Sequence, residues 1–167
     1  MADGVAVWVS GPNDDAVARV AAAITDRLGQ RRIEVETLVA RTPGIDALAG
    51  ATMDRRVAVL ARCLVRHGVT AVVAVPSPTR AARDEIRATV GRLIEVYVAV
   101  AGARADYEAP VRPEVQVDFP GSELAAACER TLRTLELLGY LRPADDPSYS
   151  AEEERQVIRR LKSFGYL

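Results

Sequence analysis

The chain is poor in the residue types that build metal sites and disulfide frameworks. It has one histidine (His67) and two cysteines (Cys63 and Cys128) among 167 residues. Zinc sites draw on clusters of cysteine and histidine, so this class of site is excluded. The two cysteines stand apart on predicted helices, and we expect each to be a buried free thiol, as in a reducing cytosol.

Long hydrophobic runs and an excess of one charge are also missing. The longest apolar runs, such as residues 69–76, are far too short to cross a bilayer. The amino-terminal Met-Ala-Asp-Gly has no basic and apolar signal region. The net charge is −1 with both signs interspersed, which offers no footprint for nucleic acid or anionic lipid. We therefore expect a cytoplasmic protein that binds neither nucleic acid nor membrane.

Ala, Val and Leu are plentiful, and they follow an alternation of strands and helices. Strands are predicted at residues 5–10, 33–39, 70–75, 93–100 and 114–117. Helices are predicted at residues 14–28, 52–67, 79–90 and 121–138. This alternation indicates βαβ units with right-handed crossovers, and so a parallel sheet covered on both faces. Residues 70–75 and 93–100 are almost wholly apolar, which is typical of interior strands in a single α/β domain.

Local signals mark the ends of several elements. Asn13 or Asp14 can cap the first helix, and Gly29 can end it. Gly68 can end the second helix in the same way. Residues 40–52 are interpreted as a loop, because proline and glycine break any regular pattern there.

A polar linker and one further helix follow residue 142. We expect Ser150 to cap this helix, with acidic residues 152–154 in its first turn and an apolar stripe through Leu161. The predicted organisation is a domain of residues 1–142 and a tail of residues 143–167. Two roles are open for the tail: docking on its own domain, or gripping a partner.

Residues 5–23 have the layout of a phosphate-binding loop, with a strand, a glycine turn and a helix. Such a loop needs G-x-x-x-x-G-K-[ST], with glycines to aim N–H groups, a lysine for the β- and γ-phosphates and a hydroxyl for Mg²⁺. Gly11 opens the turn, but the second glycine, lysine and hydroxyl positions hold Ala16, Val17 and Ala18.

The same turn carries charges that a phosphate loop would not. Asp14 and Asp15 place two negative charges where a polyphosphate would lie. Two interpretations are open: an ordinary strand–turn–helix, or a relict nucleotide cleft in which Arg19 partly replaces the lysine.

Two more clusters are candidates for anion binding. Ser77 and Arg80 follow the strand at residues 70–75, and ligands of open α/β sheets bind beyond the carboxyl ends of strands. Arg55 and Arg56 stand at the head of the second helix, from which either could reach into the same cleft. The competing interpretations are a proline-stiffened helix start and a solvated helix face.

Taken together, these segments resemble adenylylsulfate kinase, the family that phosphorylates adenosine 5′-phosphosulfate on its 3′-hydroxyl. The family's opening V-W-[FL]-T-G-L-[SP]-x-[AS]-G-K-S-T aligns without gaps on residues 7–19. Its R-R-[IV], S-P-Y-R-x-x-R-[DE]-x-x-R, E-V-[YF]-V and Y-E-x-P-x-x-P-E are similar, in that order, to residues 55–57, 77–87, 95–98 and 107–114. The resemblance implies a P-loop NTPase-like three-layer sandwich with a five-stranded parallel sheet and an extra carboxyl-terminal helix.

Departures from the family's pattern concentrate where catalysis would take place. Besides the loop positions, the family's D-G-D, whose aspartate is taken to activate the substrate hydroxyl, falls near residues 37–39, where there is no carboxylate. Of the family's long lid only residues 101–106 remain. Phosphoryl transfer depends on positioning, on Mg²⁺ and on water exclusion, so these losses together predict that catalysis is gone.

The resemblance and its departures lead to three hypotheses about function. The first is a pseudoenzyme without cofactors, acting as a binding or regulatory partner in sulfate activation or sulfur-ester metabolism. It would form a homodimer or hold a partner protein through the carboxyl-terminal helix. Its relict anion site would be Ser77, Arg80, Arg55 and Arg56. The alternative is a residual adenylylsulfate kinase, or another transferase acting on adenosine phosphosulfate with ATP and Mg²⁺. The third is a purely structural module, with the carboxyl-terminal helix as its interaction element.

Overall fold

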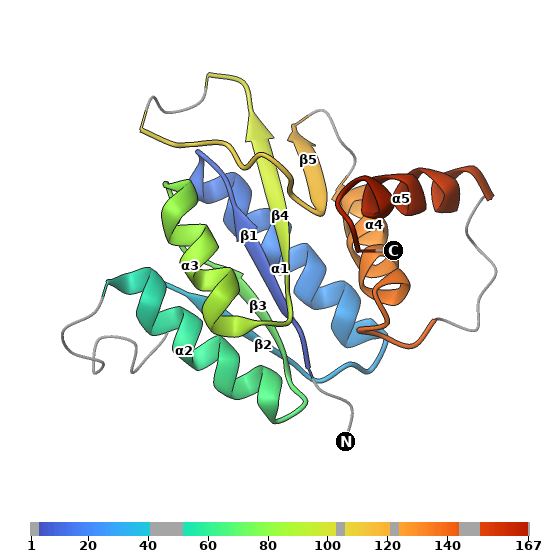
Figure 1. Ribbon diagram of the computed structural model, residues 1–167, viewed down its shortest axis with the longest axis horizontal. Coiled ribbons are helices and arrows are strands. Elements are labelled where there is room, and N and C mark those ends of the chain that lie inside the picture. The colour runs from blue at the N-terminus through green and yellow to red at the C-terminus, as the bar shows by residue number, and fades with distance from the viewer. Residues whose placement is uncertain (1–3, 41–51, 103–105, 121–123, 144–150, 167) are drawn as a thin grey trace.

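The computed structural model describes residues 4–40, 52–102, 106–120, 124–143 and 151–166. The predicted loop at residues 40–52, most of the linker and the expected cap Ser150 therefore lie largely or wholly outside the described residues. Five parallel strands form one sheet in the order β2-β3-β1-β4-β5, and helices cover both of its faces (Figure 1). The expected α/β three-layer sandwich is confirmed.

The elements follow one another as expected from the sequence. The strands are β1 (Ala6–Ser10), β2 (Val35–Val39), β3 (Thr70–Ala74), β4 (Leu93–Val100) and β5 (Val115–Phe119). The helices are α1 (Asp14–Gln30), α2 (Met53–Arg66), α3 (Arg80–Val90), α4 (Leu124–Leu137) and α5 (Ala151–Ser163). The two strands predicted to be interior, β3 and β4, flank β1, which is the middle strand.

The first helix ends later than expected. α1 runs through Gly29 to Gln30, so the prediction that Gly29 ends it is wrong. The chain reverses instead at Arg32, which has φ 57°, and Ile33 N–H returns to the carbonyl of Leu28. Gly68, just beyond α2, has φ 83°, as expected of a glycine that ends a helix.

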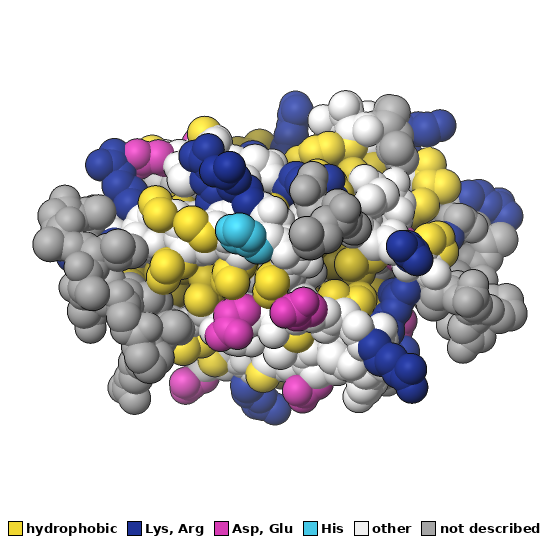
Figure 2. Space-filling view, turned by 90° about the horizontal axis from the view of Figure 1, so that it is seen from below, with side chains coloured by type: hydrophobic (Ala, Val, Ile, Leu, Met, Phe, Trp, Pro, Cys, Tyr) yellow, Lys and Arg dark blue, Asp and Glu magenta, His cyan; other side chains and the backbone are white. Residues whose placement is uncertain are grey.

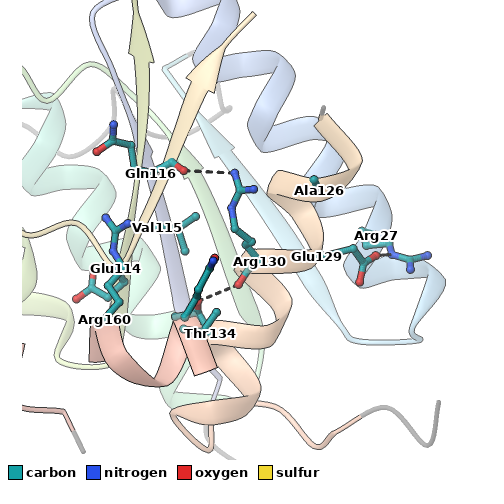
Figure 3. A pocket seen from close by; sticks show the side chains of 11 residues that line it. Arg27, Glu114, Val115, Gln116, Ala126, Glu129, Arg130, Thr134 and Arg160 are labelled. Atoms are coloured by element: carbon teal, nitrogen blue, oxygen red, sulfur yellow. Dashed lines mark hydrogen bonds and ion pairs between the residues drawn. The ribbon is translucent and has the colours of Figure 1, made fainter. Parts of the chain in front are cut away.

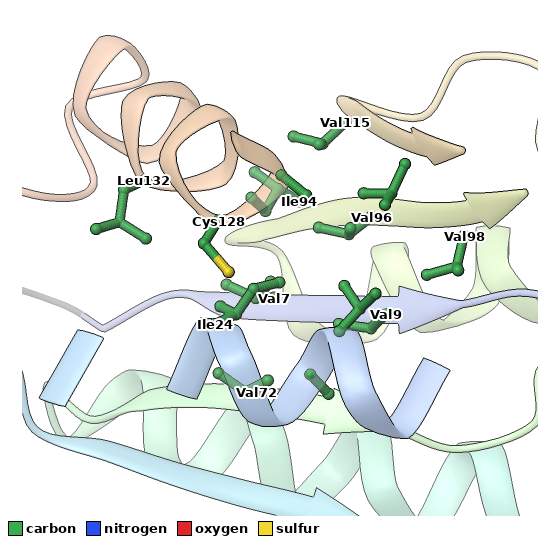
Figure 4. Close-up of a cluster of buried hydrophobic side chains, with 14 of the residues drawn as sticks. Val7, Val9, Ile24, Val72, Ile94, Val96, Val98, Val115, Cys128 and Leu132 are labelled. Carbon is green, nitrogen blue, oxygen red and sulfur yellow. The ribbon is translucent and has the colours of Figure 1, made fainter. Parts of the chain in front are cut away.

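The hydrophobic core has two halves, one on each face of the sheet. On one face, α1 and α4 pack on alternate residues of β1 and β4 around Ile24, Ile94 and Cys128 (Figure 4). On the other face, α2 and α3 pack around Trp8. The thiol of Cys128 is buried as expected, but the expectation for Cys63 is wrong, because this thiol is exposed on the side of α2 away from the sheet.

The carboxyl-terminal helix docks on its own domain. Leu161 of α5 is fully buried, and the Arg160 guanidinium donates to the carbonyl of Pro113 at 2.9 Å, just before β5. Gly139 and Gly165 both take positive φ, so α4 and α5 end in the same way, as their matching sequences indicate. Of the two roles left open for the tail, docking is the one seen.

The surface carries charges of both signs. One face of the molecule shows basic, acidic and hydrophobic side chains interspersed (Figure 2). In the part of the chain that the structure describes, no helix has the length and apolar character needed to span a membrane.

Gly11 is required by packing where β1 leaves the sheet. A Cβ on this residue would lie 2.5 Å from the carbonyl oxygen of Val98 in β4. We expect Gly11→Ala to lower the free energy of unfolding by about 2–4 kcal/mol, because the backbone would have to shift. Gly29→Ala is the matched control, since a Cβ there meets nothing within 4 Å and a helix interior favours alanine by about 0.5–1 kcal/mol. Equal effects of the two changes on urea unfolding would contradict this account.

Candidate functional site

The turn after β1 is closed by the cap of α1. Asn13 accepts the N–H of Ala16 on its side-chain oxygen at 2.9 Å and the N–H of Val17 on its carbonyl at 3.0 Å. These N–H groups belong to the stretch that a phosphate-binding loop would turn toward a nucleotide. Here they are used within the first turn of the helix.

The side chains of this turn do not converge on a cleft. Val17, at the position of the family's lysine, is buried in the core beneath Gly11. Asp14, Asp15 and Ala18 are exposed. The guanidinium of Arg19 lies over the ring of Phe119 at 5.4 Å, so the structure places it at the end of β5 rather than over the turn.

A largely buried polar network joins the end of β1 and the residues after β3 to Glu95, the third residue of β4. We call it the strand-end network, and its members are Trp8, Ser10, Asp54, Ser77, Arg83, Glu95 and Tyr107. Trp8 Nε1–H donates to Ser77 Oγ at 3.1 Å, and Ser77 Oγ–H donates to Asp54 Oδ1 at 3.0 Å. The hydroxyl of Ser77 therefore both accepts and donates a hydrogen bond within the network.

Arg83 is the hub of this network. It is 6% exposed, and its Nε lies 2.9 Å from Glu95 Oε1. Its two terminal nitrogens donate to the carbonyls of Ser77 and Glu108, and its guanidinium lies 5.2 Å from the centroid of the Tyr107 ring. Tyr107 and Glu108, which follow the segment where the family has its lid, are therefore held against α3, and through Arg83 they are linked to β4.

The network continues to the carboxyl-terminal tail. The carboxylate of Glu114 accepts hydrogen bonds from both terminal nitrogens of Arg87, at 2.8 and 3.0 Å. It also accepts one from the backbone N–H of Glu95 at 2.7 Å. The hydroxyl of Tyr166 donates to Glu114. One continuous chain of contacts therefore joins the end of β1 to the last described residue.

Burial dominates the electrostatics of these groups. It raises the pKa of the Asp54 carboxyl and of the Glu95 carboxyl above their ordinary values, although Arg83 works in the opposite direction in both cases. For Tyr166, burial and the hydrogen bond to Glu114 raise the pKa to about 12.

The four residues predicted to form an anion site do not surround one cavity. Ser77 is buried in the strand-end network. Arg55 is 60% exposed and pairs with Glu85 at 2.5 Å, while Arg56 is half-buried on the same helix. Arg80 is exposed and donates to the carbonyl of Ala109 at 2.8 Å.

Arg80 does line a cavity, but its other walls were not expected. The cavity has a volume of about 310 Å³ and is lined also by Arg83, Arg87, Arg112 and two residues of the tail, Phe164 and Tyr166. We call it the Arg80 cavity. The sequence pointed to Arg80, whereas the burial of Arg83 and the tail's part in the cavity depend on tertiary contacts that no local pattern encodes.

Metal ligands do not gather within the described ranges. No group of three or more His, Cys, Asp or Glu side chains there has an arrangement that could hold an ion.

The sheet order and the strand–turn–helix after its middle strand define an α/β protein of the P-loop kinase class. Among solved structures, that of APE1195 shares 23% identity and a TM-score of 0.69 over 79% of this chain and 96% of its own. The hexameric APS kinase from Thiobacillus denitrificans shares 23% identity and a TM-score of 0.67, over 85% of this chain and 31% of that one. These likenesses support the fold.

The family follows from the sequence comparison. The model of adenylylsulphate kinase matches residues 3–103, and the chain belongs to this family. The adenylyl-sulfate kinase of Gloeothece citriformis is 27% identical over 83% of this chain and 98% of its own length. The probable adenylyl-sulfate kinase of Pyrococcus abyssi is 27% identical over 83% of this chain and 99% of its own.

The raised pKa of Asp54 predicts a pH-dependent stability. The folded state keeps a proton on Asp54 at pH values where the unfolded chain has lost it, so this contribution is full below about pH 3.8 and is lost as pH rises through the folded pKa. Asp54→Asn stays neutral and can still accept the Ser77 hydrogen bond. We expect the free energy of unfolding of this variant, measured relative to that of the parent protein in urea titrations, to increase as pH rises from 4 to 7.

The exposed carboxylate of Asp84 gives the control for this measurement. Asp84→Asn should change the free energy of unfolding by less, and without the same rise. A flat or shrinking difference between Asp54→Asn and the parent protein would contradict the assignment.

The burial of Val17 predicts that its replacement by the family's lysine is costly. Val17→Lys would bring an ammonium group into an apolar core, so we expect a loss of about 2–4 kcal/mol in the free energy of unfolding. Ala18→Lys, at the exposed next position, should stay within about 0.5 kcal/mol of the parent protein. Chemical denaturation of both variants measures the difference, and a neutral Val17→Lys would mean that the turn opens readily.

Proposed function

We propose that this protein is a catalytically degenerate member of the adenylylsulphate kinase family that acts by binding a partner or a small anionic ligand. The observation that carries the proposal is the cap of α1, in which Asn13 accepts hydrogen bonds from the N–H groups of Ala16 and Val17. A nucleotide polyphosphate at this turn would find no lysine and would face the exposed carboxylates of Asp14 and Asp15. Like charges at such short range repel.

The region of the expected catalytic base supports the same proposal. Around the position of the family's D-G-D, the hydroxyl of Thr37 pairs with that of Thr25 at 3.0 Å, and Leu38 is buried against the sheet. Neither side chain can accept a proton from a substrate hydroxyl at neutral pH.

For the ligand, we propose that the Arg80 cavity takes the place of the site first expected at Ser77 and Arg55. Its volume of about 310 Å³ lies at the low end of small-molecule sites. Arg80 and Arg112 are exposed at its rim, where guanidinium groups can meet an oxyanion. Self-association through the tail also belongs to the proposal, with the hexameric Thiobacillus relative as a precedent for assembly.

The alternative function is phosphoryl transfer from ATP to adenosine phosphosulfate. The names of the relatives favour it, since those from Gloeothece and Pyrococcus are both kinases or probable kinases acting on adenylyl sulfate. This function requires a way of binding the triphosphate of ATP that does not use the N–H groups hydrogen-bonded to Asn13. Turnover of adenosine phosphosulfate with ATP and Mg²⁺, abolished by Arg80→Ala, would establish it over our proposal.

Calorimetric titration with ATP and Mg²⁺ tests the proposal directly. We expect no saturable binding up to millimolar ATP, because the turn at residues 11–19 lacks the groups that hold a triphosphate. The Gloeothece adenylyl-sulfate kinase, titrated under the same conditions, is the positive control. Saturable micromolar binding by this protein that is lost when ATP is replaced by adenosine would overturn the proposal.

A further inference from the structure

A second and larger cavity lies on the opposite side of the edge strand. It has a volume of about 530 Å³ and is formed by β5, α4 and α5, with Arg27 near the end of α1 at one side (Figure 3). This volume falls within the range of small-molecule sites. We call it the β5–α5 cavity. Apart from Arg27, its lining residues lie beyond residues 3–103, the part that matches the family model.

Three charged side chains that line the cavity are in ion pairs. Arg27 pairs with Glu129 at 2.5 Å. Glu114 is neutralised by Arg87 at 2.8 Å, from the other side of β5. These contacts leave the carboxylates of the cavity compensated.

Arg130 and Arg160 are different. Arg130 donates to the carbonyl of Gln116 at 3.4 Å, and Arg160 donates to the carbonyl of Pro113 at 2.9 and 3.3 Å. Within the described residues, neither guanidinium has a carboxylate partner in an ion pair. Both are half-buried, so the cavity holds two guanidiniums that stand outside the ion pairs of the described residues.

The two guanidiniums also affect each other. The pKa of Arg160 is lowered, first by burial and then by the positive charge of Arg130, while the carboxylate of Glu114 works in the opposite direction. Like charges in a partly dry cavity repel, and an anion between them would relieve the repulsion.

The rest of the lining is suited to an organic group. Val115, Ala126 and Val157 provide apolar surface, and Gln156 adds a hydrogen-bonding amide. Figure 3 shows the Arg130 side chain coming from α4 and the Arg160 side chain coming from α5. In this view the side chain of Val115 from β5 lies between them.

We propose that the β5–α5 cavity binds a small organic phosphate monoester, with the phosphate between Arg130 and Arg160 and the organic part against Val115 and Val157. A phosphate monoester carries a charge of about −1.5 to −2 at pH 7, which matches two guanidiniums that form no ion pair with a described carboxylate. Guanidinium groups bind such oxyanions through paired N–H donors. A sulfate ester or a carboxylate has a single charge and would compensate half of the excess.

Phenyl phosphate is the probe for this site, with phenyl sulfate and benzoate as singly charged counterparts. We expect saturable binding of phenyl phosphate by calorimetry at low salt, and weaker binding of the other two. In ¹H–¹⁵N spectra the shifts should fall on residues 114–116, 126–134 and 156–160. The result does not depend on whether the protein binds ATP, because the turn at residues 11–19 is not part of the cavity.

Two variants test the role of the cavity. Arg130→Gln gives up one long hydrogen bond and should weaken phenyl phosphate binding about tenfold or more. Ala126→Asp, on the exposed side of α4, adds a negative charge to the wall and should also weaken it. Arg66→Gln, on the exposed face of α2, is the matched control and should leave the affinity unchanged.

The outcomes separate cleanly once thermal unfolding shows that the variants fold. Loss of affinity in Arg130→Gln and Ala126→Asp, but not in Arg66→Gln, supports the proposal. It is overturned if phenyl phosphate shows no saturable binding, if Arg130→Gln binds as the parent does, or if the shifts fall around residues 11–19. Tighter binding of phenyl sulfate or benzoate would overturn the assignment of a doubly charged ligand.

Discussion

The buried guanidinium of Arg83 is the contact on which the carboxyl edge of the sheet depends. A buried charge is tolerated where it is paired and its donors are satisfied, and Arg83 meets Glu95 and two backbone carbonyls. Those partners come from the end of β3, from β4 and from the segment before β5. Removing the guanidinium would leave Glu95 buried without its nearest positive charge, so this one side chain fixes how three distant segments meet.

The course of the strands and helices was predictable, because their signals are local. Asn13 caps α1 as its residue type indicates, and the apolar strands β3 and β4 lie in the interior of the sheet. The end of α1 was not predictable from Gly29, since the reversal point is set by the hydrogen bond that Ile33 makes to Leu28. The exposure of Cys63 was missed because α2 has one inward face, and a cysteine is compatible with either side.

The site was predictable only in part. The motif positions identified Val17 as a lost lysine, yet that its side chain lies in the core could be learned only from the packing beneath Gly11. Ser77 and Arg80 lie three residues apart in the sequence and were expected to act together. The structure separates them, because Ser77 turns inward to Trp8 and Asp54 while Arg80 points to the surface. Contacts with the tail, such as that of Tyr166 with Glu114, span more than 50 residues and have no local signature.

Under the proposed function, the cap at Asn13 also constrains how ATP binding could be restored. A helix start is set by the residue before it, so restoring glycine, lysine and serine at positions 16–18 would leave the first turn of α1 wound as it is. The order of reversal would therefore matter: the asparagine would have to go first, and only then could the later changes be selected for an effect on nucleotide. Before that first step, lysine at position 17 would bring the cost of a buried ammonium group while the N–H groups of the turn stay hydrogen-bonded to Asn13.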